Sequence, residues 1–304
     1  MAVYADGTWS WHYTTIMALG RRQFLAGALA AARARSQERS GKAAPPRATP
    51  LVCLYSQALI EIDYIELPQI VRGLGFDGCN LTVKPGGHVN PKAADVSLMP
   101  ALEAMSGVDL EVPIITTALT SMADPTAGEV LGLAGVIGVP FFRPGPWRFS
   151  APSPALQHEI AGLGAVGRAS KSAMGIPNTG EAAGGTVANV SRIVRPLDPR
   201  WVGFDFDPSP AAVDGGADAV AAAFAMALPR LKMVTVRDCK KDATACPLGE
   251  GVVDWRHFFG LLAGAKFTGP ITLQVDYRAQ DNLAAIRRDG EFVRKCLGTG
   301  YGAG

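Results

Sequence analysis

Short apolar runs alternate with stretches of helical periodicity along most of this chain, and this alternation most constrains the fold. Each run is bounded by Gly, Pro or polar residues. Continuous apolar runs of this length are typical of parallel strands buried on both faces. We therefore predict eight strands, over residues 51–56, 77–83, 112–117, 139–143, 174–178, 201–206, 231–236 and 271–275.

Helical patterns fill the intervals between the runs and follow the last one. Asp124 and Asp254 are natural N-caps for two of these helices, and Gly138 follows the end of one. Eight strand–helix units predict an α/β protein of the (β/α)8, or TIM, barrel class, built as a single domain over residues 51–297. An open doubly wound sheet is the alternative, but no GxGxxG motif follows the first strand. The predicted helices span residues 60–74, 91–107, 125–137, 154–174, 186–194, 211–228, 254–265 and 282–296.

The first fifty residues differ in composition from the rest of the chain. Residues 21–25 read Arg-Arg-Gln-Phe-Leu and precede a short apolar run, which resembles a twin-arginine export signal. We predict a leader over residues 1–34, a disordered linker over 35–50 and a flexible Gly-rich tail over 298–304. A working signal would place the protein in the periplasm. A disordered basic leader is the alternative, and the protein would then stay in the cytoplasm.

Composition narrows the kinds of partner. The 304-residue chain is 48% hydrophobic and has a net charge of only +2, which argues against a nucleic-acid partner. The apolar run of the leader is shorter than the ~20 residues that a membrane-spanning helix needs, so we expect no stable membrane insertion. Five cysteines include no CxxC pair, although Cys239 and Cys246 could form a disulfide. Association into a homodimer stays open.

In a (β/α)8 barrel the residues that follow each strand meet at one mouth, where the chemistry takes place. The sixth run, WVGFDFDPSP, ends in Asp205 and Asp207, which share a strand face because side chains alternate. Asp207 lies nearer the tip, whereas Asp205 could equally be a structural hydrogen-bond acceptor. Hard divalent cations prefer carboxylate oxygens. A Mg²⁺ or Mn²⁺ site is therefore one interpretation, with Glu181, Asp207 and Asp276 as ligands. The alternative is a set of ion pairs with Arg143, Arg237 and Arg278.

Other polar residues follow the remaining strands. Lys84 and His88 lie in a Gly-rich segment after the second strand, and His88 could be an acid, a base or a loop residue that caps carbonyls. Glu250 lies between two glycines and could reach the mouth or merely end a turn. The candidate substrate contacts are Arg143, Asn178, Glu250 and Gln274. No GxSxG elbow or P-loop is present.

Several segments together resemble the xylose-isomerase-like TIM barrels, a family of sugar phosphate isomerases and epimerases. The similarity covers residues 51–297, with the motifs in the family's order. It is carried by Gly75–Val89 (GFDGCNLTVKPGGHV), Pro140–Phe149 (PFFRPGPWRF), Asp198–Asp207 (DPRWVGFDFD), Lys232–Asp238 (KMVTVRD), Cys246–Trp255 (CPLGEGVVDW) and Gly269–Tyr277 (GPITLQVDY).

The resemblance implies a divalent metal held at the tips of late strands and two carboxylates that exchange protons next to a sugar carbonyl. Asp207 matches the family's Asp ligand. Asp276 matches a Glu of the family on the eighth strand, and its side chain is one methylene shorter than that Glu. The position on the fifth strand that is often Glu in relatives falls near Asn178, and Glu181 follows shortly after it. Where relatives have histidine, this chain has Val236 or Arg237 and the sequence Asp-Pro-Ser-Pro. The resemblance therefore implies a degraded metal site, at which Arg237 would repel a cation.

We therefore expect an enzyme of the sugar or keto-sugar isomerase or epimerase type that abstracts a proton next to a carbonyl, with divalent metal assistance. Its expected catalytic residues are Lys84, His88, Asp207, Arg237 and Asp276. One alternative is a barrel that binds a sugar without turnover. The other is a metal-free keto-sugar lyase or hydratase.

Overall fold

The computed structural model describes residues 48–147, 151–178 and 185–302. Contacts divide the chain after Pro46, and all the described residues belong to the second of the two units. The expected leader (1–34), nearly all of the expected linker (35–50) and the candidate ligand Glu181 lie outside the described residues.

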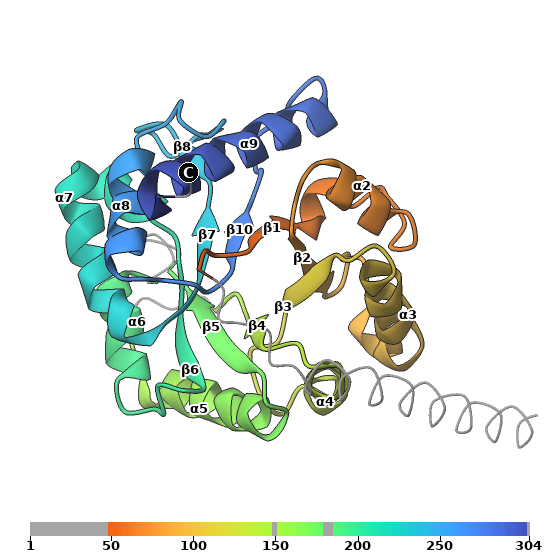
Figure 1. Cartoon of the computed structure of the whole chain (residues 1–304). Helices are drawn as coiled ribbons and strands as arrows, with labels where there is room; N and C mark the ends of the chain where they lie inside the picture. The colour runs from red at the N-terminus through yellow and green to blue at the C-terminus, as the bar shows by residue number, and fades with distance from the viewer. Residues whose placement is uncertain (1–47, 148–150, 179–184, 303–304) are drawn as a thin grey trace, which may run out of the picture. The chain divides into compact units, whose positions relative to one another are not determined.

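Within the described ranges, eight parallel strands close into a barrel (Figure 1), which confirms the predicted (β/α)8 class. Neighbouring strands pair in sequence order, and β10 pairs with both β7 and β1 to close the ring. The strands are β1 Val52–Tyr55, β2 Gly78–Val83, β3 Glu111–Thr117, β4 Phe141–Arg143, β5 Ala173–Pro177, β6 Val202–Phe206, β7 Leu231–Val236 and β10 Ile271–Leu273.

Helices surround the barrel, and a short antiparallel pair follows β7 (Figure 1). The pair consists of β8 Asp238–Cys239 and β9 Ala245–Cys246. The α-helices are α2 Leu67–Gly73, α3 Ala94–Ser106, α4 Ala127–Ile137, α5 Pro154–Ala169, α6 Val187–Val194, α7 Ser209–Ala227, α8 Trp255–Gly264 and α9 Asn282–Tyr301, and the 3-10 turns are η1 Ser56–Leu59, η2 Pro91–Ala93 and η4 Leu228–Arg230.

Strand β6 shows how the sequence orients its side chains. Phe206 packs against Phe224 of α7 and Phe258 of α8, with ring centroids 5.8 Å away in both cases. These rings belong to the core between the barrel and its outer helices. Because side chains alternate along a strand, Asp205 points the other way, into the barrel.

Local capping signals explain where several helices begin and end. Asp254 accepts a hydrogen bond from the backbone N–H of His257, which confirms it as the N-cap of α8. Gly138 closes α4 with φ +87°, a conformation that favours glycine. Helix α4 begins later than predicted because Asp124 instead caps the turn before it, accepting from the backbone N–H of Thr126.

Other predicted boundaries were also wrong, including the helix expected over residues 154–174, which ends at Ala169 because Lys171 turns the chain with φ +58°. The helix expected over residues 60–74 begins only at Leu67, because Asp63 turns the chain and accepts from the backbone N–H of Ile65. Pro68 then occupies the first turn of α2, where a missing N–H costs nothing. Helix α9 continues to Tyr301, so residues 298–301 are helical rather than part of a flexible tail.

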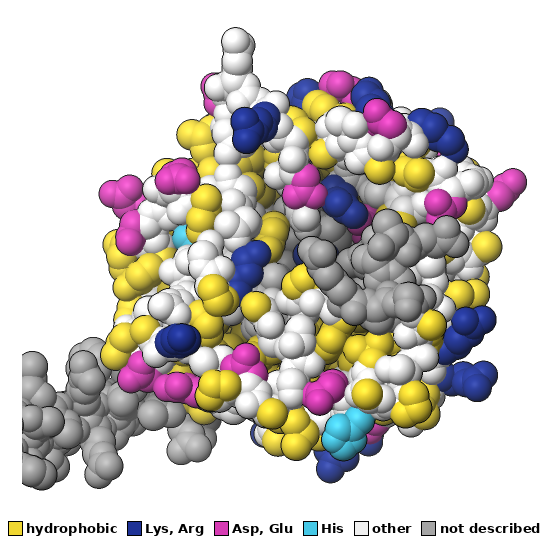
Figure 2. All heavy atoms as spheres, turned by 180° about the vertical axis from the view of Figure 1, so that it is seen from behind, with side chains coloured by type: hydrophobic (Ala, Val, Ile, Leu, Met, Phe, Trp, Pro, Cys, Tyr) yellow, Lys and Arg dark blue, Asp and Glu magenta, His cyan; other side chains and the backbone are white. Residues whose placement is uncertain are grey.

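Helix α7 is alanine-rich and unusually apolar. Among the described residues, Ser209–Arg230 is the one helical stretch long and apolar enough to cross a membrane by length and composition. It packs against β6 and neighbours α6 and α8, so it serves here as an outer helix of the barrel. On the face shown in Figure 2, Lys and Arg side chains are interspersed with Asp and Glu, and neither sign dominates.

Candidate active site

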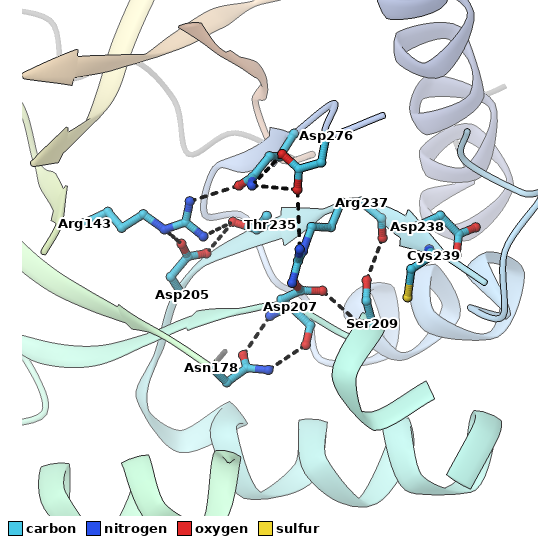
Figure 3. A network of polar contacts seen from close by, with 11 residues as sticks. Arg143, Asn178, Asp205, Asp207, Ser209, Thr235, Arg237, Asp238, Cys239 and Asp276 are labelled. Carbon is cyan, nitrogen blue, oxygen red and sulfur yellow. Dashed lines mark hydrogen bonds and ion pairs between the residues drawn. The ribbon is translucent and has the colours of Figure 1, made fainter. Parts of the chain in front are cut away.

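Polar side chains from five strand ends form a continuous network at the barrel mouth (Figure 3). Its inner part centres on Arg143, the last residue of β4. The Arg143 Nε lies 2.6 Å from Asp205 Oδ2, and Nη2 donates to Thr235 Oγ1 at 3.1 Å. The Thr235 hydroxyl in turn donates to Asp205 Oδ1 at 2.9 Å. Strands β4, β6 and β7 are thereby tied together inside the barrel.

Asp205 is a supporting residue rather than a ligand for substrate. Its side chain is only 1% exposed, and both of its oxygens face partners within the protein. Burial raises the pKa of Asp205, whereas the charge of Arg143 and the Thr235 hydroxyl act to lower it. Its effect is to fix the orientation of Arg143, in line with the structural alternative for this residue.

The outer part of the network is built on Asp207, which follows β6. Asn178 Nδ2 donates to the Asp207 carbonyl at 2.7 Å, and the Asp207 N–H donates back to Asn178 Oδ1 at 2.8 Å. The Asp207 carboxylate accepts from the backbone N–H of Ser209 (2.8 Å) and from Arg237 Nε (2.5 Å). Asp207 is thus held by its backbone and by both carboxylate oxygens, with 4% of its side chain exposed.

Arg237 links Asp207 to Asp276 across the mouth. Its Nη1 donates to Asp276 Oδ2 at 3.4 Å, and the side chains of Arg237 and Asp276 are 35% and 32% exposed. The negative charge of Asp207 raises the pKa of Arg237 above its ordinary value. Arg237 therefore remains a cation under all working conditions. It and Asp276 are the two charged groups of the network that a ligand could reach.

Gln274 joins the two parts of the network. Its Nε2 donates to both oxygens of Asp276, at 3.0 and 2.9 Å, and its Oε1 accepts from Arg143 Nη1 at 3.1 Å. This arrangement fixes the Asp276 carboxylate from the side of β10. Four predicted site residues, Arg143, Asp207, Arg237 and Asp276, thus lie in one network with the predicted contacts Asn178 and Gln274.

The described residues do not fit a divalent metal. Asp207 and Asp276 are bridged by the Arg237 guanidinium, and neither has a carboxylate oxygen without a partner. Across the described ranges, no group of three or more His, Cys, Asp or Glu side chains is placed to hold a metal ion. The third predicted ligand, Glu181, lies outside those ranges.

The structure places His88 in a supporting position. Its Nε2 donates to the Leu59 carbonyl at 3.2 Å, and its Nδ1 lies 3.1 Å from the Thr82 hydroxyl. Burial lowers the pKa of His88 below 6.5, with the Leu59 and Ile62 carbonyls opposing that shift. Both ring nitrogens are engaged, as the carbonyl-capping alternative expects. Lys84 is partly buried and donates to the Tyr55 hydroxyl at 2.9 Å.

Glu250 does not join the network. Its carboxylate lies 3.4 Å from Arg288 Nη1 on α9, and both side chains are at least half exposed. It lines a surface hollow of about 290 Å³ together with Leu248, Arg288, Glu291, Phe292 and Lys295, none of which belongs to the network. Cys239 and Cys246, which could have formed a disulfide, are both free thiols.

Asp238 was missed as an organising residue. Its buried carboxylate accepts from the backbone N–H groups of Gly249 (3.0 Å) and Gly251 (3.1 Å) and from Trp255 Nε1 (2.9 Å). It also accepts from the N–H groups of Cys239 and Val253. The signal in the sequence was the Gly-Glu-Gly segment, since a Cβ at Gly251 would lie 2.0 Å from Asp238 Oδ1. The sequence also did not predict that Thr235 and Ser209 join the network. Thr235 lies in a largely apolar strand and Ser209 lies between two prolines, so neither stands out as a functional residue.

Comparison with known proteins gives a consistent result. A family model described as xylose isomerase-like TIM barrel matches residues 131–296. No curated protein sequence matches the chain significantly. An L-ribulose 3-epimerase structure superposes with a TM-score of 0.65 at 16% identity, covering 84% of this chain and 97% of its own. A 3-keto-D-glucoside 4-epimerase from E. coli superposes with a TM-score of 0.64 at 16% identity, covering 82% of this chain and 100% of its own. A xylose isomerase-like TIM barrel protein from Mycobacterium smegmatis, in complex with magnesium, superposes with a TM-score of 0.63 at 16% identity, covering 83% of this chain and 97% of its own.

Proposed function

Because this chain belongs to the xylose isomerase-like TIM barrel family, we propose that it is a sugar or keto-sugar isomerase or epimerase that moves a proton next to a carbonyl. The names of its structural neighbours, an L-ribulose 3-epimerase and a 3-keto-D-glucoside 4-epimerase, support this class of reaction. At 16% identity these neighbours support the fold alone. The chemistry therefore has to be argued from the residues of this chain.

The observation that carries the proposal is the pair formed by Asp276 and Arg237. A carboxylate and a guanidinium lie 3.4 Å apart at the mouth, and each is about one-third exposed. A carbonyl whose oxygen accepts from Arg237 becomes polarised, and its neighbouring C–H becomes more acidic. Asp276, the exposed carboxylate beside Arg237, acts as the base that takes the proton.

The remaining residues of the network position these two groups. Asp207 holds the Arg237 guanidinium through Nε, and Asn178 holds Asp207. Gln274 orients the Asp276 carboxylate through two hydrogen bonds. The negative charge that develops on the carbonyl oxygen is stabilised by Arg237. Isomerisation then returns the proton to the neighbouring carbon while a hydroxyl proton passes to the carbonyl oxygen, whereas epimerisation takes a proton from water on the opposite face of the same carbon. The described residues do not fit a divalent metal, so no step is assigned to one.

A second candidate is a barrel that binds a sugar without turnover. It is favoured by the engagement of both His88 ring nitrogens and both Asp207 oxygens within the protein. Asp276 is then the one accessible carboxylate of the described network. A lyase or hydratase would use the same proton abstraction and differ only in the loss or addition of water at the next carbon.

The test follows proton exchange in D2O by ¹H NMR, using a panel of unphosphorylated ketoses and 3-keto-glycosides. The wild-type protein should exchange the C–H next to the carbonyl of at least one sugar and form product. Asp276→Asn should lose roughly 10²- to 10⁴-fold in exchange rate, the usual contribution of a general base. Asp207→Asn should also lose turnover, because Arg237 loses its anchor.

The matched control is Asp218→Asn, an exposed position on α7. It should exchange at the wild-type rate. Full exchange by Asp276→Asn would remove Asp276 as the base. Calorimetric binding of a sugar with no exchange by the wild type would instead establish the binding barrel.

A further inference from the structure

The Arg237 guanidinium bridges Asp207 and Asp276, the two predicted metal ligands that lie in the described ranges. We propose that this guanidinium permanently takes the place of a metal ion there, so that the mouth excludes divalent metals and a side-chain cation binds the substrate oxygen instead. The second half of this statement rests on the proposed function, whereas the exclusion of metal does not.

The hydrogen bonds of the two carboxylates support this proposal. Asp207 Oδ2 contacts Arg237 Nε at 2.5 Å, and Oδ1 accepts from the backbone N–H of Ser209. Asp276 Oδ2 contacts Arg237 Nη1, and both of its oxygens accept from Gln274. A metal ion would need these same oxygens as ligands and would lie beside a fixed positive charge.

Contacts on both sides also fix the backbone of Arg237. The Ser209 hydroxyl donates to the Arg237 carbonyl at 2.7 Å, on the side of α7. The next residue, Asp238, is 3% exposed and accepts five hydrogen bonds, one from the adjacent Cys239 N–H and four from donors between Gly249 and the start of α8 at Trp255. The Arg237 backbone is therefore fixed on both sides, and a cation that displaced the guanidinium would have to break its contacts with Asp207 and Asp276.

One edge of the guanidinium remains available to a ligand. Nε and Nη1 are committed to Asp207 and Asp276, whereas Nη2 donates to no residue in the described ranges. The side chain is 35% exposed. A planar N–H group in this position suits a carbonyl or hydroxyl oxygen of a sugar. On the proposed function, this edge binds the carbonyl oxygen of the sugar.

The exclusion is tested by titrating Mn²⁺ into the full-length protein and measuring free Mn²⁺ by EPR. The wild type should show no stoichiometric binding. Arg237→Ala frees two neighbouring carboxylates and should bind one Mn²⁺ at least about tenfold more tightly than the wild type. Arg237→Lys retains a positive charge and should behave as the wild type does. Arg256→Ala, an exposed arginine on α8, is the matched control and should not bind.

The double variant Arg237→Ala with Asp207→Asn should lose the acquired site. Circular dichroism of each variant establishes that it is folded. Stoichiometric Mn²⁺ binding by the wild type that Asp207→Asn abolishes would overturn the proposal, and so would the absence of binding to folded Arg237→Ala. These readouts need no substrate, so they are independent of whether the protein turns over a sugar.

Discussion

Replacing Asp238 by asparagine tests how this chain fixes Arg237 at the barrel mouth. The change removes a negative charge and one acceptor oxygen but keeps the size of the side chain. In the protein, Oδ2 accepts from three donors, those of Gly249, Gly251 and Trp255, and Oδ1 accepts from two. An asparagine would therefore keep its oxygen at the Oδ2 position and turn its NH2 group toward Cys239 and Val253.

The magnitude follows from this orientation. The two N–H groups that face the new NH2 lose their acceptor, and a buried unsatisfied donor costs about 1–3 kcal/mol. The three remaining hydrogen bonds lose their ionic character, and charge-assisted bonds are roughly twice as strong as neutral ones. We expect the free energy of unfolding to fall by about 3–5 kcal/mol. The melting temperature should fall by roughly 10 °C.

The assay is reversible chemical denaturation followed by near-UV circular dichroism, with Trp255 close to the altered carboxylate as a local probe. Asp254→Asn is the matched control, because it makes the same chemical change in the same segment. Asp254 is an exposed N-cap, and asparagine caps helices about as well as aspartate does. Its unfolding free energy should change by less than about 0.5 kcal/mol.

A loss of less than about 1 kcal/mol in Asp238→Asn, comparable to that of the control, would refute this reasoning. It would mean that the five N–H groups are satisfied without the carboxylate. The claim that Arg237 is fixed from the side of β8 would then also lose its support.

Two further predictions concern the residues around the network. Asn178→Ala removes both hydrogen bonds to the Asp207 backbone, so kcat should fall roughly ten- to hundredfold with little change in KM; an unchanged kcat would show that Asp207 needs no such support. The pKa of His88 is lower in the folded protein than its ordinary 6.5, so the unfolded state binds the proton more readily and stability falls as the pH drops through 6.5. His88→Gln should therefore flatten the dependence of unfolding free energy on pH between about pH 7 and pH 5, and an equally steep dependence would exclude His88 as its source.

The barrel could be predicted from the sequence because its strands are buried on both faces. Such strands appear as largely apolar runs, and all eight were found. The helix expected over residues 60–74 failed because the apolar spacing of Ile60, Ile62 and Ile65 resembles a helix. Ile60 and Ile65 are in fact exposed in a turn. Asp63 and Pro68 were the better guide to the local conformation.

The site could be predicted only in part, for a similar physical reason. Residues that follow strands converge by topology, so Arg143, Asp207, Arg237, Gln274 and Asp276 were identified as a group. How they are paired depends on side-chain geometry, which strand spacing does not contain. Asp238 was missed because most of its partners are backbone N–H groups, and these carry no residue-specific signal. Glu250 has the right position in the chain but turns toward α9.

The charges of the network explain how an arginine can serve at such a mouth. Asp205, Asp207 and Asp276 face Arg143 and Arg237, which leaves one net negative charge when all five groups are ionised. Arg237 interacts more closely with Asp207, at 2.5 Å, than with Asp276, at 3.4 Å. Asp207 therefore holds the guanidinium, while the side chain stays exposed enough to bind a carbonyl oxygen. The same residual negative charge would repel a phosphate ester, which is why unphosphorylated sugars are the appropriate substrates to test.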